Sequence, residues 1–348
     1  MNKFVAIIIS FLVTISCKNL PSKYLDNRPY PKYRMDAQDT GVVLPYGKGP
    51  DSCDYMGARD VWVFKANDST FCMHYDASGP QGWLAALAVS HDLIHWKNIG
   101  TILQFGNKNE PDSKSASYGT TYFDGTKWHM FYLGTPNVTP SPNLIPGFPY
   151  LCMKAESNSP FGPWIKQKEV VPFKPKEKTF YSSTASPGFI VKNNDEYLMF
   201  FSAADFTIKR TLCIARTKNL DSSWQINPEP ILPPNEQIEN SSIYFEETNK
   251  TWFIFTNHIA YDKYGEYTDA VWMYWSKDLY KWNPENKAVV IDGQNCKWSK
   301  RCIGLPSVIK YNNRLAIFYD APGDNSISHM LRSIGLAFLK LPLIPPTE

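Results

Sequence analysis

Two carboxylates occupy matching places in two similar stretches of the chain. Asp60 stands before the apolar residues 61–64, and Glu239 lies in the stretch 238–245, which a turn joins to an aromatic run at 251–256. Runs of this kind are typical of β-strands joined by hairpins. A carboxylic acid and a carboxylate held around one glycosidic bond can cleave it, because one protonates the leaving oxygen and the other activates water or attacks carbon. This chemistry needs a fold that brings two distant positions together.

The strand pair that contains Glu239 recurs in altered form along the chain. Five copies of an apolar strand, a turn and a second aromatic strand align on equivalent residues, which are Phe64, Phe123, Val191, Phe245 and Ile309. A third strand follows each pair, and in two copies it leads into Ser-x-Asp-Leu-x-x-Trp, at 90–96 and 276–282. Alternating or wholly apolar strands separated by Gly, Asn, Asp and Pro predict antiparallel sheets.

This repeat predicts an all-β fold, a five-bladed β-propeller with four-stranded antiparallel blades around a central channel. Aromatic residues make up 15% of the chain, and its 27 prolines and 19 glycines suit many short strands and tight turns. The alternative is a β-sandwich whose strands resemble one another by accident, but a sandwich gives no reason for the repeated tryptophan turn. Tryptophans at this repeat position are predicted to pack between blades: Trp96, Trp164, Trp224 and Trp282.

The beginning of the chain has the pattern of a signal peptide. Lys3 precedes an apolar run, and small residues lead to Cys17, as in a bacterial lipoprotein signal. The run is too short to span a bilayer as a mature helix. The sequence therefore predicts a lipoprotein-type signal peptide at 1–17, a tether at 18–45 and a single propeller domain at 46–348. A protein lipid-anchored in the bacterial cell envelope, in the periplasm or at the outer membrane, is expected, with plain secretion as the alternative.

Charge and cysteine usage narrow the classes further. The net charge of +3 over 348 residues, without a basic stripe, gives no indication of nucleic-acid binding. Export permits disulfides, although spacing cannot fix their connectivity. The pairs that spacing suggests are Cys296 with Cys302 and Cys53 with Cys72. Cys152 and Cys213 lie in equivalent apolar strands and are predicted to be buried small hydrophobic residues. No cysteine stands at metal-ligand spacing with a histidine, so no metal site and no required cofactor are predicted.

In a propeller the first strand of every blade begins at one rim of the channel. Among the five strand starts, only those at 58–60 and 239–241 contain a carboxylate. Two structural alternatives stay open, since Arg59 could form a simple ion pair with Asp60, and Glu239 could accept hydrogen bonds from loop amides. Side chains predicted to contact substrate at the same rim are Arg59, Asp76, Tyr118, Asp205, His258, Trp298 and His329, with Trp83 as a further stacking candidate. A structural role is the alternative for the two histidines, and turn capping is the alternative for Asp76 and Asp320.

On these features the chain resembles the five-bladed β-propeller glycoside hydrolases, the superfamily of family 43 with its relatives in families 32, 62, 117 and 130. In family 43 the general base is an aspartate four residues before the landmark of the first blade, and Asp60 stands four residues before Phe64. The family's general acid opens a later blade in Glu-Gly-Pro-x-x-Tyr, and Glu239 with Tyr244 is similar. The resemblance covers all five blades and includes the Ser-x-Asp-Leu-x-x-Trp turns.

The chain departs from the family pattern at two places. Asn and Ser follow Glu239 where the family has Gly-Pro, and the third family carboxylate, which adjusts the pKa of the acid, is missing from the equivalent stretch 185–187. Asp269 is predicted to replace it, because it precedes the third strand of the repeat that supplies Glu239; Asp205 and Asp76 are the other candidates. Relatives hold calcium in the channel, so the resemblance implies that structural calcium can occur, although the sequence shows no ligand loop for it.

The resulting prediction is an exported glycoside hydrolase that acts on plant or algal poly- or oligosaccharides. Asp60, Glu239 and Asp269 are the predicted catalytic carboxylates, and inversion is the course that the resemblance implies. A glycoside phosphorylase of the same fold is one alternative, and it would need basic residues around phosphate. The candidates for that role are Arg59, Lys300, Arg301, Arg332 and His329. The other alternative is a lipoprotein that binds glycans without cleaving them.

Overall fold

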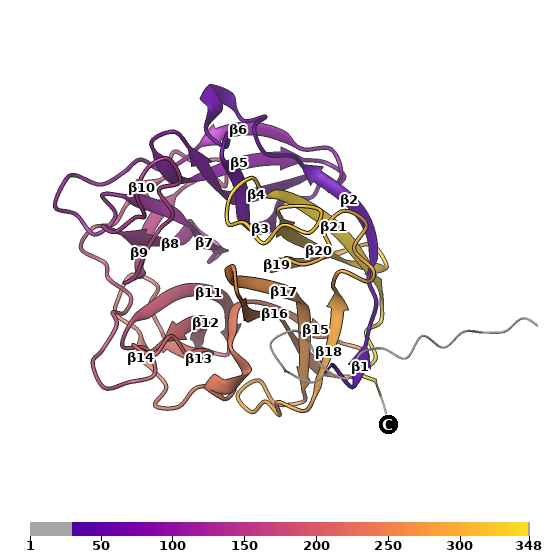
Figure 1. The fold of residues 1–348 in the computed structure, drawn as a ribbon. Helices are drawn as coiled ribbons and strands as arrows, with labels where there is room; N and C mark the ends of the chain where they lie inside the picture. The colour runs from indigo at the N-terminus through magenta and orange to yellow at the C-terminus, as the bar shows by residue number, and fades with distance from the viewer. Residues whose placement is uncertain (1–29, 347–348) are drawn as a thin grey trace, which may run out of the picture. The chain divides into compact units, whose positions relative to one another are not determined.

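β-Strands account for nearly all the regular structure in the computed structural model, which describes residues 30–346. The 3-10 helices Pro50–Ser52 and Pro234–Glu236 are the only helical elements among these residues, and no described helix has the length and apolar character to cross a membrane. The strands form four hydrogen-bonded sheets in which antiparallel pairing dominates. Figure 1 shows the sheets following one another in chain order around a common centre. The predicted all-β class is confirmed.

The largest sheet contains two antiparallel series of strands. A short parallel pairing between β5 and β7 joins them, with Trp83 opposite Ser115 and Leu84 opposite Ala116. The first series is β3 (Gly57–Asn67), β4 (Thr70–Gly79), β5 (Gly82–Ser90) and β6 (Lys97–Thr101). The second is β7 (Ser115–Phe123), β8 (Trp128–Thr135), β9 (Leu151–Ser157) and β10 (Ile165–Lys166).

Each of the other three sheets contains one antiparallel series. The first is β11 (Thr184–Asn193), β12 (Glu196–Ala204), β13 (Arg210–Thr217) and β14 (Gln225–Ile226). The next is β15 (Ile238–Glu246), β16 (Thr251–Asp262), β17 (Gly265–Ser276) and β18 (Lys287–Ile291), and the last is β19 (Gly304–Tyr311), β20 (Arg314–Ala321) and β21 (Ser333–Lys340). The strand pairs predicted from the sequence fall on the first two strands of each series.

Two strands near the beginning of the described chain pair with strands from its end. β1 (Tyr33–Arg34) pairs in parallel with β18, and β2 (Gln38–Leu44) pairs antiparallel with β21. The prediction of a tether at 18–45 is therefore wrong for these two strands, because β2 completes the sheet of β19–β21. The folded unit begins at Pro31. The predicted signal peptide and the tether up to residue 29 lie outside the described residues.

Apolar side chains form cores between neighbouring series of strands. Phe131 packs with side chains of β11–β13, and Phe200 packs with side chains of β15–β17. Val61 of the first series shares a core with Phe318 of the last sheet, so the first and last series are also packed together. The repeated tryptophans belong to these cores, as predicted: Trp96, Trp164, Trp224 and Trp282.

The described cysteines are all free thiols. The two suggested disulfides, Cys296–Cys302 and Cys53–Cys72, are therefore wrong. The first fails because its thiols face different neighbours, with Cys296 Sγ 3.5 Å from the Tyr319 hydroxyl oxygen and Cys302 Sγ 3.6 Å from Thr268 Oγ1. The other two described thiols are fully buried in a core, which confirms the prediction made for Cys152 and Cys213.

The first strand of each series contains a β-bulge near its beginning. The pairing changes register between residues 59 and 62 in β3, 117 and 120 in β7, 186 and 189 in β11, 239 and 242 in β15, and 304 and 307 in β19. Three bulges hold a left-handed residue, with φ of 51° at Asp60, 60° at Asn240 and 57° at Leu305. A bulge bends the strand and changes the direction of the side chains beside it.

Candidate active site

Asp60 and Glu239 line the same pocket, although they belong to different sheets. The bulged residues of all five first strands also line it, and they are Asp60 with Val61, Tyr118 with Gly119, Pro187 with Gly188, Asn240 with Ser241, and Leu305 with Pro306. The five strand starts singled out in the sequence therefore converge. The bulges are what turn these backbone segments toward one pocket.

A repeated hydrogen bond positions four of the five bulges. In each, a backbone N–H donates to a side chain near the end of a second strand. The pairs are Asp60 N to Asp320 Oδ2, Tyr118 N to Asp76 Oδ1, Asn240 N to Ser202 Oγ, and Leu305 N to Asn257 Oδ1. The exception is the series that begins with β11, where Pro187 has no N–H to donate and the apolar Leu133 stands at the acceptor position. Asp76 and Asp320 thus hold the backbone of a neighbouring series, instead of capping their own turns.

Asp60 lies beside one cation and a buried carboxyl group. Arg59 Nε is 3.2 Å from Asp60 Oδ2, so the ion pair considered for this residue is present at the pocket itself. The buried carboxyl group of Asp76 interacts with Asp60, and its Oδ1 accepts a hydrogen bond from the backbone N–H of Tyr118. Burial, together with the charge of Asp60, raises the pKa of Asp76 well above its usual value. Asp60 thus lies between a guanidinium group and a carboxyl group whose pKa is raised.

Glu239 has a different environment. Arg210 Nε lies 2.9 Å from Glu239 Oε2, and Arg210 Nη2 lies 2.8 Å from Glu266 Oε1, so one guanidinium serves two carboxylates. Burial raises the pKa of Glu239, and the charges of Glu266 and Asp60 act in the same direction, while Arg210 opposes them. The pKa of Glu239 is raised overall. The mutual electrostatic effect of Asp60 and Glu239 agrees with their place in one pocket.

His329 and Arg59 reach the pocket as predicted. His329 Nδ1 lies 3.1 Å from Arg59 Nη1, and the Arg59 guanidinium lies over the ring of Trp83 at 5.4 Å from its centroid. Burial, and then the nearby Arg59 charge, lowers the pKa of His329 to about 3. The imidazole is therefore neutral and accepts the hydrogen bond from Arg59. Both side chains are suited to hydrogen bonds with sugar hydroxyls.

Tyr118 lines the pocket at the bulge of β7, but its ring belongs to the core. The side chain is 3% exposed, its hydroxyl donates to Thr121 Oγ1 at 2.9 Å, and its ring packs edge-on against His74. The prediction that this ring stacks on a sugar is wrong, because neither face of the ring is free.

Four predicted site residues do not line the pocket: Asp205, His258, Asp269 and Trp298. Asp205 accepts hydrogen bonds from the backbone of Thr207 and Lys209, so it caps its own turn. Trp298 donates to the Tyr319 hydroxyl at 2.8 Å. The prediction that these four residues lie at the pocket is therefore wrong.

Asp269 and His258 meet at a buried tryptophan. Asp269 Oδ1 accepts a hydrogen bond from Trp272 Nε1 at 3.2 Å, and His258 stacks on the Trp272 ring with centroids 4.2 Å apart. The reason lies in the β16–β17 hairpin, whose pairing changes register between Asn257 and Ile259. This shift lies opposite the segment that carries Asp269, and Glu266, three residues earlier, takes the place at the pocket.

Three residues that sequence analysis missed complete the site: Tyr150, Arg210 and Glu266. Tyr150 donates its hydroxyl to Pro146 O at 3.0 Å, and burial followed by the charge of Glu239 raises its pKa. Arg210 opens β13, and Glu266 lies in the stretch from which Asp269 was chosen. A search for charged residues at the start of every third strand would have found both.

The basic residues considered for a phosphate site are dispersed. Arg59 and His329 line the pocket, whereas Lys300 donates to Cys296 O, Arg301 pairs with Asp262 and Arg332 pairs with Asp320 at 2.6 Å. This arrangement gives no support to a phosphorylase.

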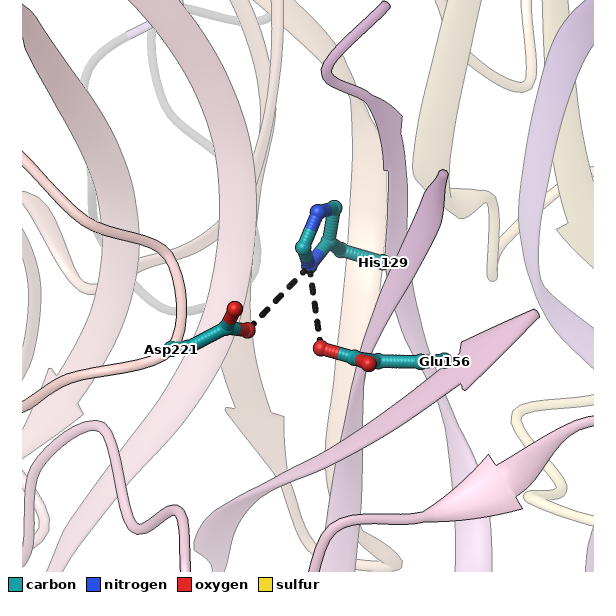
Figure 2. A group of neighbouring side chains, drawn as sticks. All are labelled: His129, Glu156 and Asp221. Atoms are coloured by element: carbon teal, nitrogen blue, oxygen red, sulfur yellow. Dashed lines mark ion pairs between the residues drawn. The ribbon is translucent and has the colours of Figure 1, made fainter. Parts of the chain in front are cut away.

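One group of described residues has the spacing of a metal site: His129, Glu156 and Asp221. Figure 2 shows the three side chains converging, with His129 Nδ1 at 3.6 Å from Glu156 Oε1 and 3.8 Å from Asp221 Oδ1. The ammonium groups of Lys154 and Lys127 contact both carboxylates, so the negative charge is already matched. The pocket carboxylates Asp60 and Glu239 each have an arginine beside them, which likewise does not fit the oxygen-only shell of calcium.

No family model and no curated protein sequence matches the chain. Solved structures do match. A glycoside hydrolase has a TM-score of 0.64 and 14% identity, over 91% of this chain and 95% of that one. A family 117 glycoside hydrolase from the marine bacterium Zobellia galactanivorans has a TM-score of 0.59 and 14% identity, over 89% and 93%. The catalytic domain of a Coprinopsis cinerea GH62 α-L-arabinofuranosidase has a TM-score of 0.59 and 12% identity, over 88% and 98%. The chain therefore shares its fold with glycoside hydrolases of several families, as the resemblance implied.

Proposed function

We propose that this protein is a glycoside hydrolase. The observation that carries the proposal is the presence of Asp60 and Glu239 in one pocket, in two different electrostatic environments. Asp60 forms an ion pair with Arg59, and the neighbouring carboxyl group of Asp76 has a raised pKa. Glu239 is half-buried, and its pKa is also raised. Enzymes divide acid and base roles between two carboxyl groups through such differences.

In the proposed reaction Glu239 is the general acid and Asp60 the general base. Glu239 protonates the glycosidic oxygen while the bond from that oxygen to the anomeric carbon breaks. Asp60 accepts a proton from the water molecule that attacks the anomeric carbon from the opposite face. The leaving group carries away the proton of Glu239, and the released sugar has an inverted anomeric configuration.

The supporting role expected of Asp269 is assigned to two other carboxyl groups. Asp76 interacts with Asp60 and accepts a hydrogen bond from Tyr118 N, so it links the base to the neighbouring series of strands. Glu266 shares Arg210 with Glu239, and its charge raises the pKa of the acid. The first group therefore supports the base, and the second supports the acid.

The proposal includes a five-bladed β-propeller. It is supported by the five bulged first strands at one pocket and by the cores between successive series. It is also supported by two links between the ends of the chain, the pairing of β2 with β21 and the hydrogen bond from Asp60 N to Asp320.

Plant or algal poly- and oligosaccharides are the proposed substrates, and the likeness to an arabinofuranosidase and to a marine family 117 enzyme supports this class. The test is product release from a panel of aryl glycosides and plant and algal oligosaccharides, with and without phosphate, followed by NMR of the first-formed anomer. Release of free sugar of inverted configuration without phosphate is expected. Turnover that requires phosphate would favour a phosphorylase, and tight binding of a glycan that is never cleaved would favour a binding protein.

Two further proposals concern the setting of the enzyme. The signal pattern supports export and a lipid anchor at Cys17. A Cys17→Ala variant should leave the membrane fraction, and an unchanged distribution would contradict the anchor.

The arginines beside the pocket carboxylates support hydrolysis without a metal. Dialysis against a chelator should leave turnover unchanged, and a loss restored by calcium would contradict this.

A further inference from the structure

Aromatic side chains contact the pocket residue Arg210 on the side of Glu239, and we call this grouping the aromatic wall. Arg210 connects the acid to this wall, because its Nη1 donates to the Tyr261 hydroxyl at 3.2 Å and its guanidinium lies 5.8 Å from the centroid of the Phe148 ring. The Tyr261 hydroxyl in turn donates to Glu266 Oε2 at 3.2 Å. The network that begins at Glu239 thus ends at a tyrosine side chain that is 43% exposed.

The two hairpins that form this network also present exposed rings at their tips. Phe206 lies in the β12–β13 turn, four residues before Arg210, and is 71% exposed. Tyr264 lies in the β16–β17 turn, between Tyr261 and Glu266, and is 69% exposed. A single exposed aromatic residue needs no explanation, but these two come from hairpins that the Arg210–Glu266 ion pair joins beside the pocket. Such a grouping indicates a surface that binds something.

We propose that Phe206, Tyr261 and Tyr264 bind the leaving-group part of a glycan chain. This inference rests on the proposed function. The general acid must touch the glycosidic oxygen, so the part of the substrate that leaves extends from the pocket on the side of Glu239. That side is the one on which the aromatic wall contacts Arg210.

Sugar rings suit such a wall. An aromatic ring can cover the apolar C–H face of a sugar while the sugar hydroxyls stay hydrated, and the tyrosine hydroxyls can hydrogen-bond to them. The substrate class is therefore an oligo- or polysaccharide that has further sugar rings beyond the cleaved bond. A glycosyl fluoride has one sugar for the pocket and a leaving group without a ring, so it places nothing on the wall.

The test replaces the two tip residues, Phe206→Ala and Tyr264→Ala, singly and together. Both side chains are largely exposed, so the fold is expected to persist. kcat/KM is measured for a glycosyl fluoride that the wild type hydrolyses and for an oligosaccharide with the same terminal sugar. We expect the double variant to lose about tenfold on the oligosaccharide, through KM, and nothing on the glycosyl fluoride, which replaces a nitrophenyl glycoside because that leaving group can also contact the rings.

Phe161→Ala is the matched control. This ring is 45% exposed and follows the end of β9 that is remote from Tyr150 and the pocket, so both substrates should be unaffected. Equal kcat/KM of the double variant and the wild type on the oligosaccharide would overturn the inference and leave the proposed function standing. An equal loss on both substrates would also overturn it, because the rings would then act on the pocket itself. If the wild type cleaves no glycoside, the proposed function fails and this inference fails with it.

Discussion

Two clusters of charged side chains in this protein have similar parts and opposite electrostatic outcomes. In the pocket, Arg210 lies between Glu239 and Glu266, and the pKa of Glu239 is raised because burial prevails. In the cluster of Figure 2, Lys154 lies between Glu156 and Asp221. Burial acts to raise the pKa of Asp221 there too, but its hydrogen bonds, including those to the lysines, lower it overall.

The difference comes from the number of cations and from access to solvent. The cluster of Figure 2 has a second ammonium, that of Lys127, and the Asp221 side chain is 41% exposed. The pocket has the guanidinium groups of Arg59 and Arg210 for the carboxyl groups of Asp60, Asp76, Glu239 and Glu266, and the Glu239 side chain is 24% exposed. Charges that are fully matched stabilise the fold. A carboxyl group that is short of positive charge has a raised pKa, which suits the acid role proposed for Glu239.

The largest effect should separate the two clusters by activity. Glu239→Gln and Asp60→Asn should each lower kcat/KM for a cleaved glycoside by about 10²–10⁴, because each removes a proton-transfer group and keeps its shape. Asp221→Asn in the other cluster should leave kcat/KM unchanged. Circular dichroism would check that all three variants are folded. Near-wild-type turnover of either pocket variant would remove that residue from the mechanism.

The next effect concerns the stability that the buried ion pairs of Lys154 give to the fold. Lys154 is fully buried, so Lys154→Met leaves two carboxylates without their main cation and should lower the free energy of unfolding by about 3 kcal/mol. Lys168→Met removes the exposed pair with Glu110 and should lower the free energy of unfolding far less, because solvent screens that pair. Urea unfolding measures both. Equal costs for the two variants would show that burial does not distinguish these ion pairs.

A smaller effect should appear in the pH dependence of activity. The charge of Glu266 raises the pKa of Glu239, so Glu266→Gln should lower that pKa. A general acid with a lower pKa loses its proton at lower pH, and the alkaline limb of kcat/KM should move to lower pH. Glu110→Gln, on an exposed loop, is the control and should leave the limb in place. A shift of the limb to higher pH would contradict the assigned role of Glu266.

Much of this fold was readable from the sequence because its signals are local. The five strand pairs follow from alternating apolar residues and turn residues within short windows, and the positions of Asp60 and Glu239 follow from the repeat. The short strand β2 has no such signal, since its partner β21 lies at the other end of the chain. A pairing between the two ends of the described chain depends on the folded arrangement of the sheets and has no local signal in either strand.

The details of the site depended on contacts between different series of strands. Arg210 and Glu266 meet across two sheets, and the pKa of Asp76 is raised by burial and by the charge of Asp60 in the folded protein. Asp269 was misplaced because a change of register in the long β16–β17 hairpin brings Glu266 to the pocket instead. Repeat position predicts which segments reach a pocket, but a bulge decides which side chain of the segment enters it.

The assignment of Glu239 as acid and Asp60 as base is tested most directly by the dependence of each alanine variant on the leaving group. A dinitrophenyl glycoside releases a phenolate that needs no proton, whereas an oligosaccharide releases an alcohol that does. We expect Glu239→Ala to keep most of its turnover of the dinitrophenyl glycoside and to lose that of the oligosaccharide, while Asp60→Ala loses both. Equal losses on the two substrates for Glu239→Ala would contradict the central claim.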